Sequence, residues 1–293
     1  MGGVNPLREI LQKQIHGLVG FGTGEIDLDR PYGDSGLFGP GSISWTVHGD
    51  FTAMMAGGVS ALLLQMLHPG ALAGVWDHSN FRHDMLGRLR RTAQFVAGTT
   101  YGSTGQAEAL IAKVRSIHDR VTGTLPDGTA YSANDPALLT WVHAAEVTSF
   151  LAAYLRYKQP NLAIGAQDRY FAETAEIAHR LGAKEVPRSR REIERYFEEV
   201  RPQLRADGRT REVAQALFSQ PSPNALTGPF REVFLEAGVD LLPGWAAAMH
   251  GLPTSGLRRR MVRAGVNGTG RILRWALRDG SAARAKRRVG ETA

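Results

Sequence analysis

Apolar residues recur every three or four positions along most of the 293-residue chain, and this spacing is typical of amphipathic or buried helices. The predicted helices cover 6–19, 44–67, 82–97, 105–121, 136–157, 164–182, 188–204, 209–219, 228–250 and 256–278. The pattern contains no internal repeat and no sustained alternation of apolar and polar residues. It therefore predicts an all-α fold in a single multi-helix domain.

Two segments break the helical pattern. Residues 20–44 are rich in Gly and Asp and predict a long loop, whereas 122–135 contain the turn sequence Pro126-Asp127-Gly128 and predict a small hairpin. The next helix, 136–157, begins at a proline behind a capping Asn134 or Asp135 and is apolar almost all round. Such a helix belongs at the centre of a fold.

The positive charge is confined to the C-terminal part of the chain. The net charge is +7, but residues 257–293 hold eleven Lys and Arg against Asp279 and Glu291, which leaves about −2 for the rest. The body is therefore not basic, and we expect no specific nucleic-acid partner. The absence of cysteine excludes disulfides and thiolate metal sites.

The basic tail interleaves arginine with apolar residues. Arg271, Arg274 and Arg278 share one helical face, while Leu273 and Leu277 share another. The pattern is found in helices that contact an acidic membrane surface or a partner groove, and more often in helices packed by their apolar face with their arginines in water. With no long apolar run, we expect a cytoplasmic protein whose tail contacts the inner face of the membrane peripherally.

Two histidines lie where their rings can enter the core. His118 is one turn from Val114 and Val121, and His143 lies in the apolar helix 136–157. A lone helical histidine beside apolar residues is commonly structural, but two of them beside an arginine-rich third helix favour a site. On that third helix Arg88 and Thr92 are one turn apart, a spacing suited to a carboxylate or propionate, or to a solvated basic face.

A second interpretation uses carboxylates. Glu176 and His179 have the Glu-x-x-His spacing of carboxylate-bridged di-iron helical bundles, and the only partner pair is His143 with Glu146, in reversed order. No glycine-rich phosphate loop, Gly-x-Ser-x-Gly elbow or His-Glu-x-x-His motif is present in the sequence. The sequence therefore offers no motif for a nucleotide-binding, serine-hydrolase or metalloprotease function.

Four blocks in order carry a family resemblance: HPG at 68–70, GRLRRT at 87–92, IHDRVTGTLPDG at 117–128 and WVHA at 141–144. Over about residues 30–245 the chain resembles the heme-dependent oxygenase domain of latex-clearing proteins (rubber oxygenases) and MpaB-type oxygenases. The resemblance implies a globin-like core around heme b. It divides the chain into an N-terminal helix and lead-in (1–29), the oxygenase domain (30–250) and the basic helical tail (251–293).

The resemblance also implies roles for single residues. His118 matches the proximal ligand of the heme iron, Arg88 and Thr92 match residues close to the heme, and we add His143 as a further cofactor-binding residue. Rubber-cleaving members have a lysine before the threonine, where this chain has Arg91, whose guanidinium cannot ligate iron but could polarise a ligand. Arg88 and Arg91 are therefore the predicted catalytic residues.

Three functions remain open at this stage. The first is a heme b oxygenase that uses oxygen or peroxide on a small hydrophobic substrate. The second is a di-iron helical protein, and the third is a non-catalytic heme-binding protein associated with a membrane. The sequence leaves the oligomeric state open.

Overall fold

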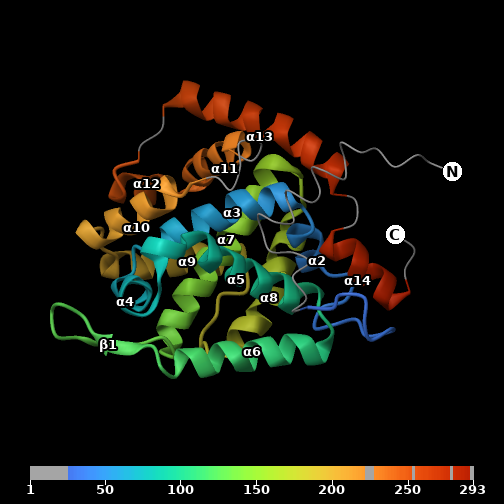
Figure 1. Cartoon of the computed structure of the whole chain (residues 1–293), viewed down its shortest axis with the longest axis horizontal. Helices are drawn as coiled ribbons and strands as arrows, with labels where there is room; N and C mark the ends of the chain where they lie inside the picture. The colour runs from blue at the N-terminus through green and yellow to red at the C-terminus, as the bar shows by residue number, and fades with distance from the viewer. Residues whose placement is uncertain (1–25, 222–227, 253–254, 278–279, 291–293) are drawn as a thin grey trace.

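The computed structural model describes residues 26–221, 228–252, 255–277 and 280–290. Within them the helices are α2 Ile43–His48, α3 Phe51–Gln65, α4 Pro69–His78, α5 Phe81–Tyr101, α6 Thr104–His118, α7 Pro136–Tyr157, α8 Ile164–Leu181, α9 Arg190–Val200, the 3-10 turn η1 Arg201–Gln203, α10 Gly208–Ser219, α11 Gly228–Leu241, α12 Gly244–Met249, α13 Gly256–Ala276 and α14 Ser281–Val289. The predicted all-α single domain is confirmed (Figure 1). The helix predicted at 6–19 lies outside the described residues.

Two long apolar helices, α3 and α7, pack against each other in the middle of the molecule (Figure 1). Each begins at an aspartate whose carboxylate accepts backbone N–H groups: Asp50 from Ala53 at 2.9 Å, and Asp135 from Ala137 at 2.8 Å. The Trp141 indole N–H donates to the Gln65 carbonyl at 3.1 Å. The predicted central position of 136–157 is therefore confirmed.

By length and composition alone, α7 is apolar enough to cross a membrane, as is the pair formed by α3 and α4, which bends by 103°. About two thirds of the apolar window of α7, 67%, is buried inside the chain. In this structure α7 is thus a core helix.

The prediction of one helix over 44–67 was wrong. The chain ends α2 at His48 and begins α3 at Phe51, because Asp50 caps the new helix. The helix predicted at 228–250 is likewise divided, since Pro243 separates α11 from α12.

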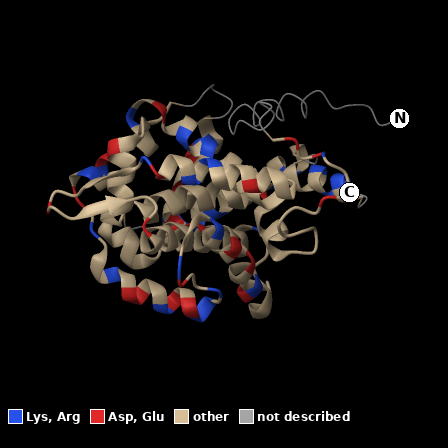
Figure 2. Cartoon of the chain, turned by 90° about the horizontal axis from the view of Figure 1, so that it is seen from below, with Lys and Arg blue, Asp and Glu red and all other residues tan. Residues whose placement is uncertain are grey.

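The predicted hairpin is confirmed, with β1 Thr122–Thr124 antiparallel to β2 Ala130–Ser132. Two elements were not expected: the apolar segment after His68 is the full helix α4, and the chain forms α14 after the predicted last helix. Figure 2 shows acidic and basic residues interspersed over the face seen there. Most of the apolar interior is one cluster that draws on α3, α7, α11 and α13.

Candidate functional site

Helix α5 carries Arg88 into the interior. Burial lowers the pKa of its guanidinium to about 10, and the nearby positive charge of Arg91 adds to this effect. Arg88 nevertheless keeps part of its surface accessible, and among the described residues its guanidinium has no hydrogen bond and no ion pair. The Arg88 side chain is thus strongly desolvated yet partly accessible, and its cation has no counter-charge among the described residues.

The other two predicted residues of α5, Arg91 and Thr92, are exposed, although both lie within about one turn of Arg88 and Thr92 shares its helix face. Arg91 Nη1 lies 3.4 Å from Asp84 Oδ2. The Thr92 hydroxyl donates to the Arg88 backbone carbonyl at 3.2 Å. Asp84 has non-helical angles (φ −139°, ψ 54°), and its carboxylate accepts the Gly87 N–H at 2.8 Å. Thr92 and the Arg88 guanidinium are therefore not held side by side by any hydrogen bond of the described residues.

His118 is the last residue of α6, just before the hairpin. Its Nδ1 is buried and has no hydrogen-bond partner among the described residues. Burial lowers the pKa of the imidazole, and the charge of Asp119 only partly opposes this. The ring is thus neutral near pH 7, the form that ligates a metal, and it is half-buried rather than sealed in the core.

His143 and Glu146 project from one face of α7. The Nε2 of His143 is buried without a partner in the described part of the chain, and burial, with a contribution from His179, lowers its pKa to about 4. Glu146 is the only acidic residue of α7, and burial raises its pKa to about 7. Near neutral pH this carboxyl group can therefore both hold and release a proton.

A further polar group next to these was not predicted from the sequence. His48 lies 2.9 Å from Thr100 Oγ1 through Nδ1 and 2.8 Å from the Tyr170 hydroxyl through Nε2. Burial, helped by His143, lowers the pKa of His48 to about 3, and Glu146 contributes to the raised pKa of Tyr170. The available signal was a single histidine inside the apolar stretch 44–67.

The carboxylate set of the di-iron interpretation does not come together. Glu176 is exposed, and its carboxylate accepts Arg180 Nε at 2.6 Å. Among the described residues, no three His, Asp or Glu side chains form a group that could hold a metal ion. Of the four residues in that set, only His143 and Glu146 face the interior, near His48 and Tyr170.

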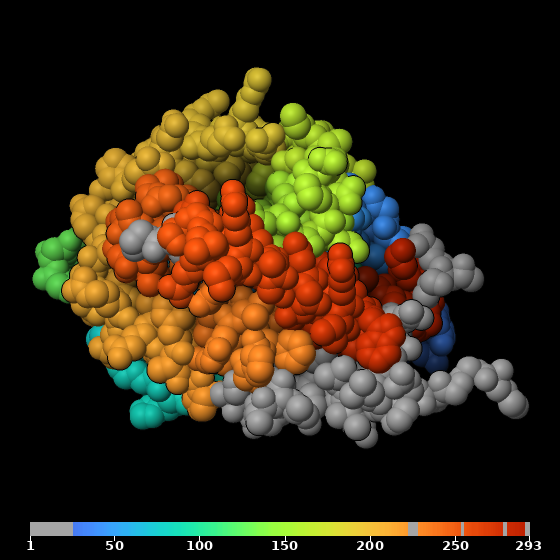
Figure 3. Space-filling view, turned by 90° about the horizontal axis from the view of Figure 1, so that it is seen from above, coloured from blue at the N-terminus to red at the C-terminus, as the bar shows by residue number. Residues whose placement is uncertain are grey.

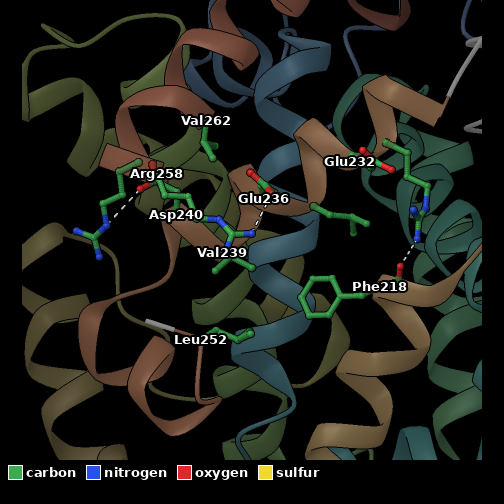
Figure 4. A pocket seen from close by; sticks show the side chains of 11 residues that line it. Phe218, Glu232, Glu236, Val239, Asp240, Leu252, Arg258 and Val262 are labelled. Carbon is green, nitrogen blue, oxygen red and sulfur yellow. Dashed lines mark hydrogen bonds and ion pairs between the residues drawn. The ribbon is translucent and has the colours of Figure 1, made fainter. Parts of the chain in front are cut away.

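A separate pocket of about 370 Å³ lies between α11 and α13 (Figure 4). Its apolar lining includes Val239 and Val262. Four of its charged side chains are paired, since Arg258 Nη2 lies 2.9 Å from Glu236 Oε1 and Arg259 Nε lies 3.5 Å from Asp240 Oδ1. None of the site residues predicted from the sequence lines it.

The comparisons with known proteins agree with the family resemblance. Residues 45–275, more than half of the chain, match the family described as ER-bound oxygenase mpaB/B′/rubber oxygenase, catalytic domain. Neither a curated protein nor a solved structure matches the chain. The matched range contains Arg88, His118, His143 and the His48–Tyr170 pair. The chain therefore belongs to the mpaB/B′ and rubber oxygenase family and carries its oxygenase catalytic domain.

Proposed function

We propose that the chain is a heme b-dependent oxygenase that acts on a small hydrophobic substrate with oxygen or peroxide. Family membership supports the oxygenase activity. The choice of heme rests on two residues in the interior of this chain. His118 has the chemistry to ligate the iron, and Arg88 has the chemistry to bind a propionate.

The observation that carries the proposal is Arg88. A buried guanidinium without a carboxylate partner is costly unless an anion from outside the chain completes it. A heme propionate is such an anion, and the planar guanidinium can bind it through two parallel hydrogen bonds. Thr92 lies one turn further along α5 and is exposed, so its hydroxyl could serve a second oxygen after leaving the Arg88 carbonyl.

His118 fits the role of a ligand of the heme iron. Its imidazole is neutral and half-buried, and its Nδ1 has no competing partner among the described residues. When bound, heme b would supply the redox chemistry of its iron, and the chain would supply orientation, desolvation and protons.

The remaining polar residues can move protons. Glu146 changes protonation near neutrality, and it lies close enough to Tyr170 to affect the pKa of that hydroxyl, which in turn contacts His48. His143, neutral with a free Nε2, can accept a hydrogen bond in the same interior. Arg91, exposed and weakly paired with Asp84, remains the candidate for polarising a ligand from the edge of the site.

The test is the visible spectrum of the purified full-length chain, before and after dithionite, with a pyridine hemochrome assay and iron analysis on the same sample. Heme b near one per chain, with oxygen uptake on addition of a hydrophobic substrate, is the expected result. Two irons per chain without porphyrin would replace the proposal with the di-iron alternative. Heme without turnover on a broad panel of hydrophobic substrates would leave a heme-binding protein instead of an oxygenase.

A further inference from the structure

Helix α13 carries a second apolar face, turned toward solvent. Leu257 is 71% exposed, Met261 68%, Ile272 46% and Trp275 37%. Since an α-helix repeats after five turns, or eighteen residues, Leu257 and Trp275 share one direction, and Met261 and Ile272 deviate from it by little. Residues Ala264 and Gly268, both exposed, lie between them on the same line. We call these residues the outer stripe.

The outer stripe is not a packing face left over from the core. The opposite side of α13 already packs on the body through Val262, Val266 and Leu273, all buried, and contacts α11 and α3. Figure 1 shows α13 as the outermost helix on its side, and Figure 3 shows it running across the face seen from there. Exposed large apolar side chains elsewhere in the described residues occur singly, on three other segments: Tyr32, Ile117 and Ile164.

The helix that carries the outer stripe has charges of one sign only. Helix α13 contains six arginines and no acidic residue. Arg274 pairs with Asp50 at 2.6 Å and Arg263 with Asp240 at 2.9 Å, so those two hold the helix on the body. Arg260 and Arg271 are both exposed, lie on the same flank of the stripe, and have no acidic partner among the described residues.

This arrangement agrees with the sequence-based alternative in which the tail helix packs by its apolar face, and corrects it at Arg274, which was expected on a basic face in water. Leu273 is buried against the body, and the Arg274 guanidinium binds Asp50 and the Tyr157 carbonyl. The apolar side chains available to a partner are instead those of the outer stripe.

We propose that the outer stripe of α13 is a docking surface for an anionic lipid bilayer. Lying in the plane of the bilayer surface, α13 would place Leu257, Met261 and Trp275 at the boundary between headgroups and acyl chains. Arg260 and Arg271 would contact lipid phosphates, with their methylene stems along the apolar surface. The wide spacing of the large side chains, with Ala and Gly between them, suits a fluid surface better than a close-packed protein groove.

The experiment is co-sedimentation of the full chain with phosphatidylcholine vesicles, with and without phosphatidylglycerol, at low and high salt. We expect binding only to the anionic vesicles, weakened by salt. Arg260→Gln with Arg271→Gln should lower the partition coefficient roughly thirtyfold, at about fivefold per arginine. Leu257→Ser with Met261→Ser should lower it at least as far. Quenching of Trp275 by brominated lipid should be lost in Trp275→Phe while binding persists.

Matched controls separate the outer stripe from general charge and apolarity. Arg195→Gln with Arg211→Gln removes the same charge from exposed positions of α9 and α10, and Ile164→Ser removes an exposed apolar side chain elsewhere. These should bind as the wild type does, and all variants should retain the wild-type thermal unfolding midpoint. Equal binding to neutral vesicles, or equal loss in the controls, overturns the proposal. So does a dimer that dissociates when the stripe is changed, since the stripe would then join two copies.

Discussion

Buried arginines occur in two regions of this molecule, and the two differ in whether the described residues accept hydrogen bonds from them. In α14 the Arg288 side chain is 1% exposed and donates to the carbonyls of Leu28, Asp34, Tyr101 and Gly102, at 3.1, 2.8, 2.6 and 3.2 Å. In α5 the Arg88 guanidinium is also desolvated, but no described residue accepts a hydrogen bond from it. One region closes the fold, and the other is left incomplete.

This difference between Arg288 and Arg88 indicates which part of the interior is the candidate functional site. A chain that satisfies Arg288 fully, and gives Asp240 the guanidinium groups of Arg156 and Arg263, is able to neutralise buried charge. It does not do so at Arg88. Within the described residues, His118 Nδ1 and His143 Nε2 also lack a hydrogen-bond partner, as do Trp45 Nε1, Thr52 Oγ1, Thr148 Oγ1 and the Tyr157 hydroxyl. Of these groups, the cation and the two imidazoles are the ones that an anion and a metal ion from outside the chain would complete.

The largest stability effect should come from the closed region. Arg288→Met should lower the free energy of unfolding by about 4 kcal/mol, because the carbonyls it binds are left buried without donors. Urea unfolding followed by circular dichroism measures this. Arg195→Met, at an exposed position of α9, is the control and should change stability by less than about 0.5 kcal/mol. A loss below about 1 kcal/mol for Arg288→Met would show that the two regions do not differ.

In the incomplete region, Glu146→Gln should raise the free energy of unfolding, whereas Arg288→Met lowers it. Burial raises the pKa of Glu146 to about 7 in the folded chain, against about 4.3 when unfolded. Its stabilising contribution is therefore present below pH 4 and is lost as pH rises through 7. After a discount for partial exposure, the variant should be roughly 2 kcal/mol more stable than wild type at pH 8 in the heme-free protein. If the difference in stability between the variant and the wild type were the same at pH 5 and at pH 8, the raised pKa of Glu146 would be contradicted.

His143→Leu should change how the stability of the protein falls at acidic pH. The pKa of His143 falls to about 4 on folding, from about 6.5, so its contribution to stability is complete above pH 6.5 and is lost as pH falls toward 4. Between pH 7 and pH 5 the wild type should lose about 1.5 kcal/mol more than the variant. Chemical denaturation of both proteins at each pH gives the difference. Parallel pH profiles would mean that the ring already accepts a proton in the folded chain.

The smallest stability change should be at Arg88 itself. Arg88→Met removes an unpaired buried charge, so the heme-free protein should be unchanged or about 1 kcal/mol more stable. The affinity for added hemin should nevertheless fall at least tenfold, as measured by titration of the Soret band. Arg82→Met, in the first turn of α5 and paired with Glu212, should leave hemin affinity unchanged. A destabilisation of Arg88→Met as large as that of Arg288→Met would remove the contrast between the regions.

Much of the fold could be predicted from the sequence, because apolar spacing reports which helix faces are buried. The breaks between helices were harder to predict. In the sequence Asp50 is a single polar residue in an apolar run. Only its capping hydrogen bond and its ion pair with Arg274, which is 224 residues away, show why α3 begins there. Helix α14 was missed because its core-facing residue is largely Arg288, whose partners are backbone carbonyls that leave no trace in the sequence.

For the candidate site, the sequence identified Arg88, His118 and His143 as side chains for the interior, and all three have desolvated polar groups there. It could not identify the His48–Tyr170 pair, because the two residues are 122 positions apart and meet only after α2 packs on α8. It also could not show that Arg91 and Thr92 are exposed, since side-chain direction depends on how α5 kinks at Asp84.

Whether His118 holds a heme iron is tested most directly by the absorption and electron paramagnetic resonance spectra of the ferric, hemin-loaded protein, compared for wild type, His118→Ala and the exposed control His179→Ala. We expect a histidine-ligated ferric heme in wild type and His179→Ala. His118→Ala should lose stoichiometric heme and recover the wild-type spectrum on addition of imidazole. A His118→Ala protein that keeps one heme per chain with an unchanged spectrum would contradict this role of His118.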